Sequence, residues 1–359
     1  MSTAYDKKTR NTTPKNTRGT SLNPHNRYER LHYDSDGDSD NQHSDTPTSV
    51  FIDKAKSVLT RQRSPDIPFE WSLNPYRGCE HGCIYCYARP SHEYLGLSAG
   101  IDFESKLFVK PNAADSLARE LDAPAYRCSP IALGSNTDPY QPIERKLRIT
   151  RAILETLLRY RHPVTITTKS DLILRDSDIL QPLAKMNLLR VFVSITTLDG
   201  TLARRMEPRA PTIAKRLQAM QALHQQGIHV TAMLAPLIPG LNDDSIESIL
   251  RAAHKHGAQQ AYYVLLRLPS VVADLWHEWL QTHYPDKAGK VRSLVRSTRQ
   301  GKDNDSRFGH RMRGNGAYAD MLAQRFQLAK QRYGLDGDFP PLTCALFQPT
   351  TKQNTLFDG

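Results

Sequence analysis

The sequence predicts an α/β fold built from six strand-then-helix units in series. Short apolar and β-branched runs alternate with helix-length segments between residues 71 and 266. These runs are too uniformly apolar for strands with one face in water, which is typical of parallel strands buried on both faces. The series implies right-handed crossovers and a parallel sheet, either an open doubly wound sheet or a curved partial barrel.

The expected elements follow from these patterns in chain order. Strands are expected at Trp71–Tyr76, Ile131–Ser135, Val164–Thr168, Val191–Thr196, Val230–Ala235 and Tyr262–Leu266. Helices between them are expected at Ala113–Leu121, Leu147–Tyr160, Ser177–Lys185, Thr212–Gln226 and Asp244–His256. In the second helix, Ile149, Ile153 and Leu157 recur at the spacing of one apolar face. Both architectures place ligands at the C-terminal ends of the strands.

Three regions are predicted along the chain. Residues 1–50 carry seven Lys and Arg against seven Asp and Glu and few apolar residues, so we expect a disordered tail. Residues 51–270 hold the α/β domain. Residues 271–359 form a basic, mainly helical extension, with helices expected at Val271–His283, Gly289–Arg299 and Tyr318–Tyr333.

Composition excludes several protein classes. The sequence has no apolar run of the roughly 18 residues that a membrane-spanning helix needs, so no membrane partner is expected. Its N-terminus lacks the apolar stretch of a secretory signal, which predicts a cytoplasmic protein. Three of the five cysteines crowd into one short segment, and in a reducing compartment this pattern indicates a metal or cluster site rather than disulfides.

The basic charge of the chain is concentrated near its C-terminus. Of the formal net charge of +11, residues 287–333 contribute +9, from twelve Lys and Arg against three Asp and Glu. Within them, Arg307, Arg311 and Arg313 alternate with aromatic residues and glycines, as in segments that follow nucleic-acid phosphates. A solvated helix face has the same composition, so nucleic acid is one of two readings of this arm.

The first expected strand runs into NPYRGCEHGCIYCYARP, a segment with three closely spaced cysteines that could bind a metal or an iron–sulfur cluster. Cys79, Cys83 and Cys86 are separated by three and two residues. Thiolates are the usual ligands of iron–sulfur clusters, and three of them leave the fourth iron of a cubane open for a substrate. The alternative is a zinc knuckle completed by His81 or His92, although the sequence offers no second cysteine pair for it.

This loop resembles the signature of the radical S-adenosylmethionine (SAM) superfamily, in which an aromatic residue commonly precedes the third cysteine, as Tyr85 does here. The resemblance covers roughly residues 70–270. It implies a partial (β/α)6 TIM-like barrel and a [4Fe–4S] cluster on the three cysteines. It also implies reductive cleavage of SAM to a 5′-deoxyadenosyl radical, which abstracts hydrogen from a substrate, and a reducing partner of the flavodoxin or ferredoxin type.

Further segments are similar to the spore photolyase branch, the DNA repair photolyase-like proteins. They are GSNTDPYQPIERKLRITR and MEPRAPTIAKRLQAM. The resemblance places Tyr85 near the adenine of SAM and Ser135, Thr137 and Asp138 at its amino group, and it makes Glu207, Arg209 and Arg216 candidate SAM or substrate contacts. The third and fourth expected strands end in TITTKSD and FVSITTLD, so we expect Lys169 to meet the SAM carboxylate and Ser194 the ribose or the carboxylate.

One departure limits what is inherited from this branch. Spore photolyase returns a hydrogen atom from a cysteine in the segment equivalent to residues 133–137, and this sequence has no cysteine there. Thymine-dimer repair is therefore not carried over. A competing class is a nucleic-acid-binding module with a structural metal site and a basic arm, but a three-cysteine loop at a strand's C-terminal end favours catalysis.

Overall fold

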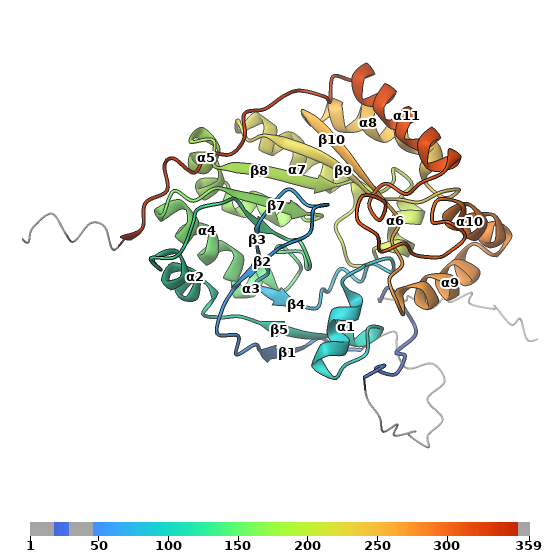
Figure 1. Cartoon of the computed structure of the whole chain (residues 1–359), viewed down its shortest axis with the longest axis horizontal. Helices are drawn as coiled ribbons and strands as arrows, with labels where there is room; N and C mark the ends of the chain where they lie inside the picture. Colours follow the sequence, from blue (N-terminus) through green and yellow to red (C-terminus); the bar gives the residue numbers. More distant parts are fainter. Residues whose placement is uncertain (1–17, 29–45, 351–359) are drawn as a thin grey trace, which may run out of the picture.

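A curved parallel sheet forms the centre of the molecule (Figure 1). The computed structural model describes residues 18–28 and 46–350. Within them the main sheet has the order β10–β9–β8–β7–β6–β3–β2, with β2 antiparallel to β3 and the other neighbours parallel. The strands are β2 Leu59–Arg61, β3 Trp71–Leu73, β6 Ile131–Leu133, β7 Val164–Thr168, β8 Leu189–Ser194, β9 Val230–Leu237 and β10 Gln260–Leu265. The six predicted parallel strands are thus confirmed.

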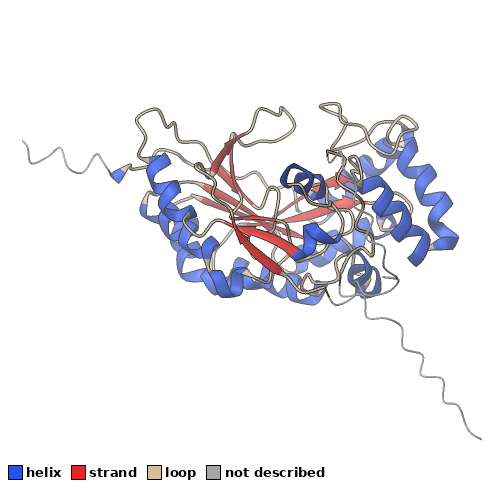
Figure 2. Ribbon diagram, turned by 90° about the horizontal axis from the view of Figure 1, so that it is seen from below, coloured by secondary structure: helices blue, strands red, loops and turns tan. Residues whose placement is uncertain are grey.

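Helices cover the outer face of this sheet, and loops cross the other face (Figure 2). The long ones are α2 Ala113–Leu121, α4 Ile149–Arg159, α5 Ser177–Lys185, α7 Ile213–Gln225 and α8 Ile246–Lys255. Between them lie the short α3 Glu144–Leu147 and α6 Gly200–Met206, and the 3₁₀ turns η3 Asp171–Asp176 and η4 Asp243–Ser245. Because each helix follows a strand and the chain then returns to start the next parallel strand, the C-terminal ends of the six parallel strands all lie at one side of the sheet.

The core joins the strands to the apolar stripes of the helices. Ile149, Ile153 and Leu157 of α4 are buried together with Val164 and Ile166 of β7. Burial of one such side chain stabilises the fold by about 1.5–3 kcal/mol. The apolar spacing that predicted this helix therefore reflects its packing.

The first predicted strand is shorter than Trp71–Tyr76. Pro75 has no N–H to donate to a ladder, and β3 ends at Leu73. The Asn74 side chain replaces the lost pairing, since its Oδ1 accepts from the backbone N–H of Asn136 at 3.0 Å and of Thr137 at 3.3 Å. The chain then enters β4 Tyr76–Arg77, which belongs to another sheet.

A small three-stranded sheet lies beside the first units and was not predicted. It has the order β1–β5–β4, with β1 Ser49–Ile52 and β5 Lys106–Val109. The 3₁₀ helix η2 Arg89–Leu95 and the helix α1 Ile101–Ser105 complete this layer. Its role is to hold the segment after β4, which contains the three cysteines.

The C-terminal extension is helical, as predicted. Its helices are α9 Val272–His283, α10 Pro285–Ser297 and α11 Ala317–Arg332. Helix α10 begins before the expected Gly289, because Pro285 at its first position lacks only an N–H that would be unsatisfied there. Leu322 and Phe326 of α11 belong to the main core, and the chain then runs past α5 (Figure 1).

The predicted disordered tail falls partly outside the described residues, which leave out 1–17, 29–45 and 351–359. Residues 18–28 and 46–50 are described, and Arg18 and Asn26 are buried. The predicted boundaries at residues 50 and 270 stay predictions. In the described part of the chain, no helix is long and apolar enough to cross a bilayer.

Candidate cofactor site

The cysteine loop is fixed by backbone hydrogen bonds on two sides. The Cys79 N–H donates to the carbonyl of Phe103 in α1 at 2.9 Å, and the Ile84 N–H donates to that of Met206 in α6 at 3.0 Å. Gly82 turns the loop with φ of 66°, in the left-handed region that favours glycine. The loop follows β4, near the C-terminal end of β3.

The three thiols are buried neighbours. Cys79 and Cys83 are 8% and 9% exposed, and Cys86 is partly buried. Burial raises the pKa of all three, that of Cys83 to about 12. The negative charges of Asp138 and then Cys83 raise the pKa of Cys79 further, and those of Glu207 and then Cys86 raise that of Cys83. The positive charge of Lys169 acts the opposite way on Cys83 and Cys86.

This donor set fits a [4Fe–4S] cluster with three protein ligands. Lys169 and Arg89 place positive charge where thiolates would be negative, and backbone N–H groups of His81 and Asp138 stabilise a Cys79 thiolate. Among residues 18–28 and 46–350, no three His, Cys, Asp or Glu side chains are gathered as for a single metal ion. The cluster assignment therefore rests on the cysteine loop and its surroundings.

The two histidines of the zinc alternative differ in their surroundings. His92 Nε2 lies 2.9 Å from the carbonyl oxygen of Lys106, and its ring packs edge-on against Phe103. His81 Nδ1 lies 3.4 Å from Asp138, while its buried Nε2 has no hydrogen-bond partner among the described residues. The buried Nδ1 of His92 likewise has no hydrogen-bond partner among the described residues, so each histidine keeps one unpaired ring nitrogen.

Tyr85 is anchored through a buried carboxylate. Its hydroxyl donates to Glu207 Oε1, and Arg216 pairs with Glu207 Oε2. Thr196 also donates to Oε1, at 3.1 Å, and Arg216 donates to the carbonyl of Ser194 at 3.2 Å. Burial would raise the pKa of Glu207, but the charges of Arg216 and Lys169 outweigh it and lower the pKa. The carboxylate therefore stays ionised.

Lys169 joins the same group from the end of β7. Its Nζ lies 5.8 Å from the centroid of the Tyr85 ring, a cation–π contact. Burial opposes its charge, but the negative charges of Cys83 and Glu207 raise its pKa overall. Two of the predicted SAM contacts, Tyr85 and Lys169, are thus brought together beside the cysteines. Their contact with SAM stays a prediction.

The predicted amino-group contacts lie at the end of β6 and are largely engaged within the protein. Asp138 accepts from the Thr168 hydroxyl at 2.7 Å and from the Lys169 N–H at 2.8 Å. Burial would raise the pKa of Asp138, but His81 and these donors lower it to about 2. Thr137 donates to the carbonyl of Tyr76 at 2.9 Å, and Ser135 accepts from Asn74 at 3.2 Å. Their role toward SAM stays a prediction.

Arg209 is separate from the Glu207–Arg216 pair although it is close in sequence. Its guanidinium pairs with Glu80 at 3.1 Å, and its N–H donates to the carbonyl of His81 at 3.3 Å. It therefore braces the first half of the cysteine loop. Ser194 contributes its carbonyl to Arg216.

Sequence reasoning missed a stacked pair at the mouth of the site. Tyr87 follows Cys86, is 45% exposed, and donates its hydroxyl to the carbonyl of Ser135. The guanidinium carbon of Arg267 lies 5.0 Å from the centroid of the Tyr87 ring. Arg267 comes two residues after the end of β10. Because ligands bind at the C-terminal ends of parallel strands, this position could have marked Arg267 as a candidate site residue.

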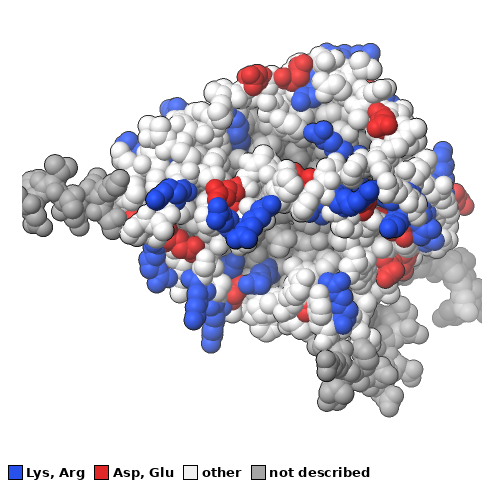
Figure 3. Space-filling model, in the orientation of Figure 1, with Lys and Arg blue, Asp and Glu red and all other residues white. Residues whose placement is uncertain are grey.

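Four arginines of the basic arm pair with carboxylates. Arg307 pairs with Asp305 at 2.7 Å, and Arg311 pairs with Asp66 in the β2–β3 turn. Arg299 is buried and donates to carbonyls at the end of β10, including that of Leu266 at 2.8 Å. On the face shown in Figure 3, basic side chains are scattered with acidic ones among them. The arm is therefore held against the C-terminal end of β10.

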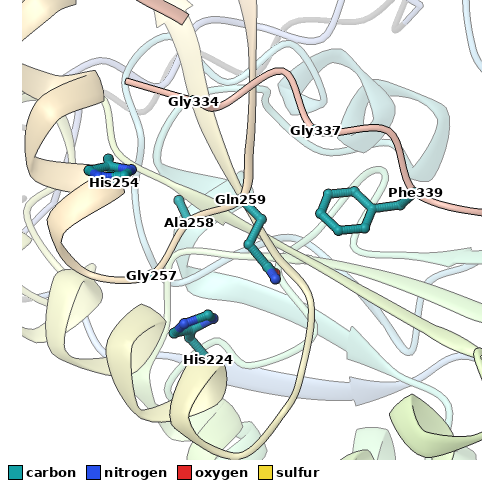
Figure 4. Close-up of a pocket in the computed structure, with 8 residues that line it drawn as sticks. All are labelled: His224, His254, Gly257, Ala258, Gln259, Gly334, Gly337 and Phe339. Atoms are coloured by element: carbon teal, nitrogen blue, oxygen red, sulfur yellow. The ribbon is translucent and has the colours of Figure 1, made fainter. Parts of the chain in front are cut away.

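A pocket of about 370 Å³ lies at the opposite end of the strands, and it does not belong to the cysteine site. His224 and His254 line it from the ends of α7 and α8, across from Phe339 (Figure 4). Gln259, which also lines it, directly precedes β10.

The remaining cysteines also lie at that opposite end. Cys128 precedes β6, with its sulfur 3.7 Å from Nε2 of His162, which precedes β7. Cys344 interacts with Cys128, and Phe347 packs edge-on against His162. Neither cysteine is therefore placed to act at the cysteine loop.

Comparisons with known proteins decide the family. A model described as the radical SAM superfamily matches residues 73–253. The chain belongs to this superfamily. An uncharacterised protein of Mycobacterium tuberculosis is 33% identical over 84% of this chain and 86% of its own. An uncharacterised protein of Methanocaldococcus jannaschii is 30% identical over 65% of this chain and 83% of its own.

Solved structures of spore photoproduct lyase share the fold of this radical SAM protein. One, complexed with dinucleoside spore photoproduct, has a TM-score of 0.56 at 13% identity, covering 79% of each chain. Another, with bound SAM and the same photoproduct, has a TM-score of 0.52 at 15% identity, covering 79% of this chain and 77% of that one. The chain is a radical SAM enzyme, and its cofactors are a [4Fe–4S] cluster and SAM.

Proposed function

We propose that Cys79, Cys83 and Cys86 hold the cluster and that SAM lies between it and Tyr85. The observation that carries this proposal is the buried cysteine loop beside Lys169 and the Glu207–Arg216 pair. When bound, the cluster supplies the electron that cleaves SAM to a 5′-deoxyadenosyl radical, which abstracts hydrogen from the substrate.

The chain's own residues orient SAM and exclude water. Glu207 and Arg216 fix the Tyr85 ring, whose face suits the adenine. The Lys169 ammonium is placed for the SAM carboxylate, with which it would form a charge-assisted hydrogen bond. Ser135, Thr137 and Asp138 would meet the SAM amino group, and Ser194, at the end of β8, would meet the ribose or the carboxylate.

Product analysis tests this assignment. The anaerobically reconstituted, reduced protein is incubated with SAM, and 5′-deoxyadenosine is measured. We expect it from the wild type and from Cys128→Ala, whose sulfur lies at the other end of the barrel. We expect none from Cys83→Ala. Equal formation by wild type and Cys83→Ala would contradict the assignment.

For the substrate, we propose a nucleic acid that places a base on the stacked pair of Tyr87 and Arg267. A half-exposed ring with a guanidinium over it, next to the third cysteine, suits base stacking and phosphate contact. The related fold of spore photoproduct lyase was solved with a dinucleoside ligand. Arg307 and Arg311 contribute less, because carboxylates already pair with them.

Salt dependence of oligonucleotide binding tests the substrate proposal. Arg267→Met should weaken binding of a single-stranded oligonucleotide and flatten the log–log salt slope by about one. Arg307→Gln is the matched control and should leave the slope near that of the wild type, since Asp305 already neutralises this side chain. No binding by the wild type, or an unchanged slope for Arg267→Met, would contradict the proposal.

A one-electron donor of the flavodoxin or ferredoxin type is the proposed reductant, because the cluster must be reduced before it cleaves SAM. The proposed compartment is the cytoplasm, whose reducing conditions keep thiols available for cluster binding.

A further inference from the structure

The N-terminal segment 18–28 packs directly on the cysteine loop. A Cβ added at Gly19 would lie 1.6 Å from the carbonyl oxygen of Gly82, which stands between Cys79 and Cys83. In the other direction, a Cβ at Gly82 would lie 3.2 Å from the nitrogen of Gly19. Two glycines thus let the two backbones meet, and no other residue type fits at Gly19 without displacing one of them.

Arg18 locks this contact. It is 3% exposed, and its Nη1 donates to the carbonyl of Glu104 at 2.7 Å. Its Nη2 donates to the carbonyl of Thr46 at 2.5 Å and to the Thr48 hydroxyl at 3.2 Å. Next to it, the Gly19 N–H donates to Oε2 of Glu104 at 2.8 Å. A buried guanidinium with several backbone and side-chain acceptors holds its segment in one position.

Glu104 connects the N-terminal segment to Cys83 through Arg89. Its Oε1 pairs with Arg89 at 2.5 Å, and both side chains are fully buried. The Nε of Arg89 in turn donates to the carbonyl of Cys83 at 3.0 Å. A continuous set of buried contacts therefore runs from Arg18 and Gly19 through Glu104 and Arg89 to the cysteine loop.

We propose that Arg18 and Gly19 are positioning residues of the cluster site, which keep the cysteine loop in its binding shape and slow the loss of the bound cluster. The inference rests on the proposed cluster assignment to this loop. The far end of the segment is anchored elsewhere, since Asn26 donates to the carbonyl of Glu93 at 2.7 Å and Arg27 pairs with Glu93 at 3.1 Å. Arg27 thus offers a control within the same segment.

Hydrogen–deuterium exchange of the cluster-free protein tests the positioning role without any cluster. Arg18→Ala and Gly19→Ala should speed amide exchange in residues 79–86 about tenfold or more, the effect of losing one buried charge-assisted hydrogen bond. Arg27→Ala should leave exchange there unchanged, because its side chain is 43% exposed and holds only the far end. Gly289→Ala is the second control, since no atom lies within 4 Å of its added Cβ.

Bleaching of the anaerobically reconstituted cluster in air supplies the second readout. Arg18→Ala and Gly19→Ala should lose the cluster absorbance severalfold faster, and Arg18→Lys should fall between Arg18→Ala and the wild type. Unchanged exchange in residues 79–86, or an equal increase throughout the protein, would overturn the inference. A wild type that takes up no cluster would instead refute the proposed cluster assignment, and the exchange result would still decide the positioning role.

Discussion

Glu207 is the buried charge on which the orientation of Tyr85 depends. It accepts from Tyr85, Thr196 and Arg216, and its side chain has no exposed surface. In such a site the cost of desolvation is offset only while every partner is present. Removing the negative charge therefore leaves Arg216 as an uncompensated buried cation and loosens the ring that is proposed to contact adenine.

Glu207→Gln should thus lower the free energy of unfolding by about 3–5 kcal/mol, the usual cost of breaking a buried ion pair. Urea denaturation measures this change. The control is Glu247→Gln, which breaks the part-exposed pair with Arg325 and should cost no more than about 1 kcal/mol. Equal losses in the two variants would contradict the structural role of Glu207.

Lys169→Ala should weaken SAM binding and leave the iron content unchanged. The reason is the position of its ammonium beside Tyr85, facing the expected SAM carboxylate. A lost charge-assisted hydrogen bond costs about 1.5–3 kcal/mol, or roughly ten- to hundredfold in affinity. Titration of the cluster spectrum with SAM measures it, and unchanged affinity would remove Lys169 from the SAM site.

The sequence could predict those site residues that lie within the cysteine motif or directly at the end of an expected strand. Tyr85 and Lys169 are of this kind, and the structure brings them together. Tyr87 stands in the same motif, but its partner Arg267 is 180 residues away, and no local pattern indicates their stacking. Asp138 was predicted at the correct strand end, but its bonds to Thr168 and Lys169 depend on the neighbouring strand.

At the scale of elements, the C-terminal segment ties the N-terminal ends of the strands together. The Gln348 N–H donates to the carbonyl of Tyr160 at 3.1 Å, and Phe347 packs against Tyr126 and His162. His162 is fully buried there, with Nε2 2.7 Å from the Tyr126 hydroxyl. The contacts of Phe347 and Gln348 join residues more than 180 positions apart, so periodicity could not predict them.

This packing predicts a pH-dependent stability. Burial lowers the pKa of His162 from its ordinary 6.5 to about 4. Between these values the unfolded chain binds the proton and the folded chain does not, so the free energy of unfolding falls as pH falls. From pH 7.5 to 5.0 the loss due to His162 should be about 2 kcal/mol.

Urea unfolding of the wild type and His162→Gln at both pH values measures this difference. The comparison isolates His162, because the two proteins share every other titrating group. We expect a smaller loss of stability on acidification in the variant. An identical pH dependence in the two proteins would show that His162 is not held neutral by burial.

At the scale of the whole molecule, the two ends of the sheet have separate tasks. The C-terminal ends carry the cysteine loop and the Tyr87–Arg267 pair, while the N-terminal ends carry Cys128, Cys344 and the C-terminal segment. The order of strands and helices could be predicted, because burial on both faces leaves a clear sequence pattern. The small sheet could not, since β1 is exposed along its whole length.

The N-terminal segment shows why the rest of the site could not be predicted. Residues 18–28 have the polar composition of a disordered tail, and the burial of Arg18 and Gly19 depends on Glu104 and Gly82, which lie far along the chain. Prediction from composition alone assigns such a polar segment to the disordered, solvent-exposed class. Only the tertiary structure shows that it closes over the cysteine loop.

The most direct test of the account is the iron and sulfide content of the five Cys→Ala variants after anaerobic reconstitution. The wild type, Cys128→Ala and Cys344→Ala should each hold about four iron and four sulfide per chain, as one cubane requires. Cys79→Ala, Cys83→Ala and Cys86→Ala should each lose them. A wild type that binds one zinc and no sulfide, or loss of iron in folded Cys128→Ala, would contradict the account.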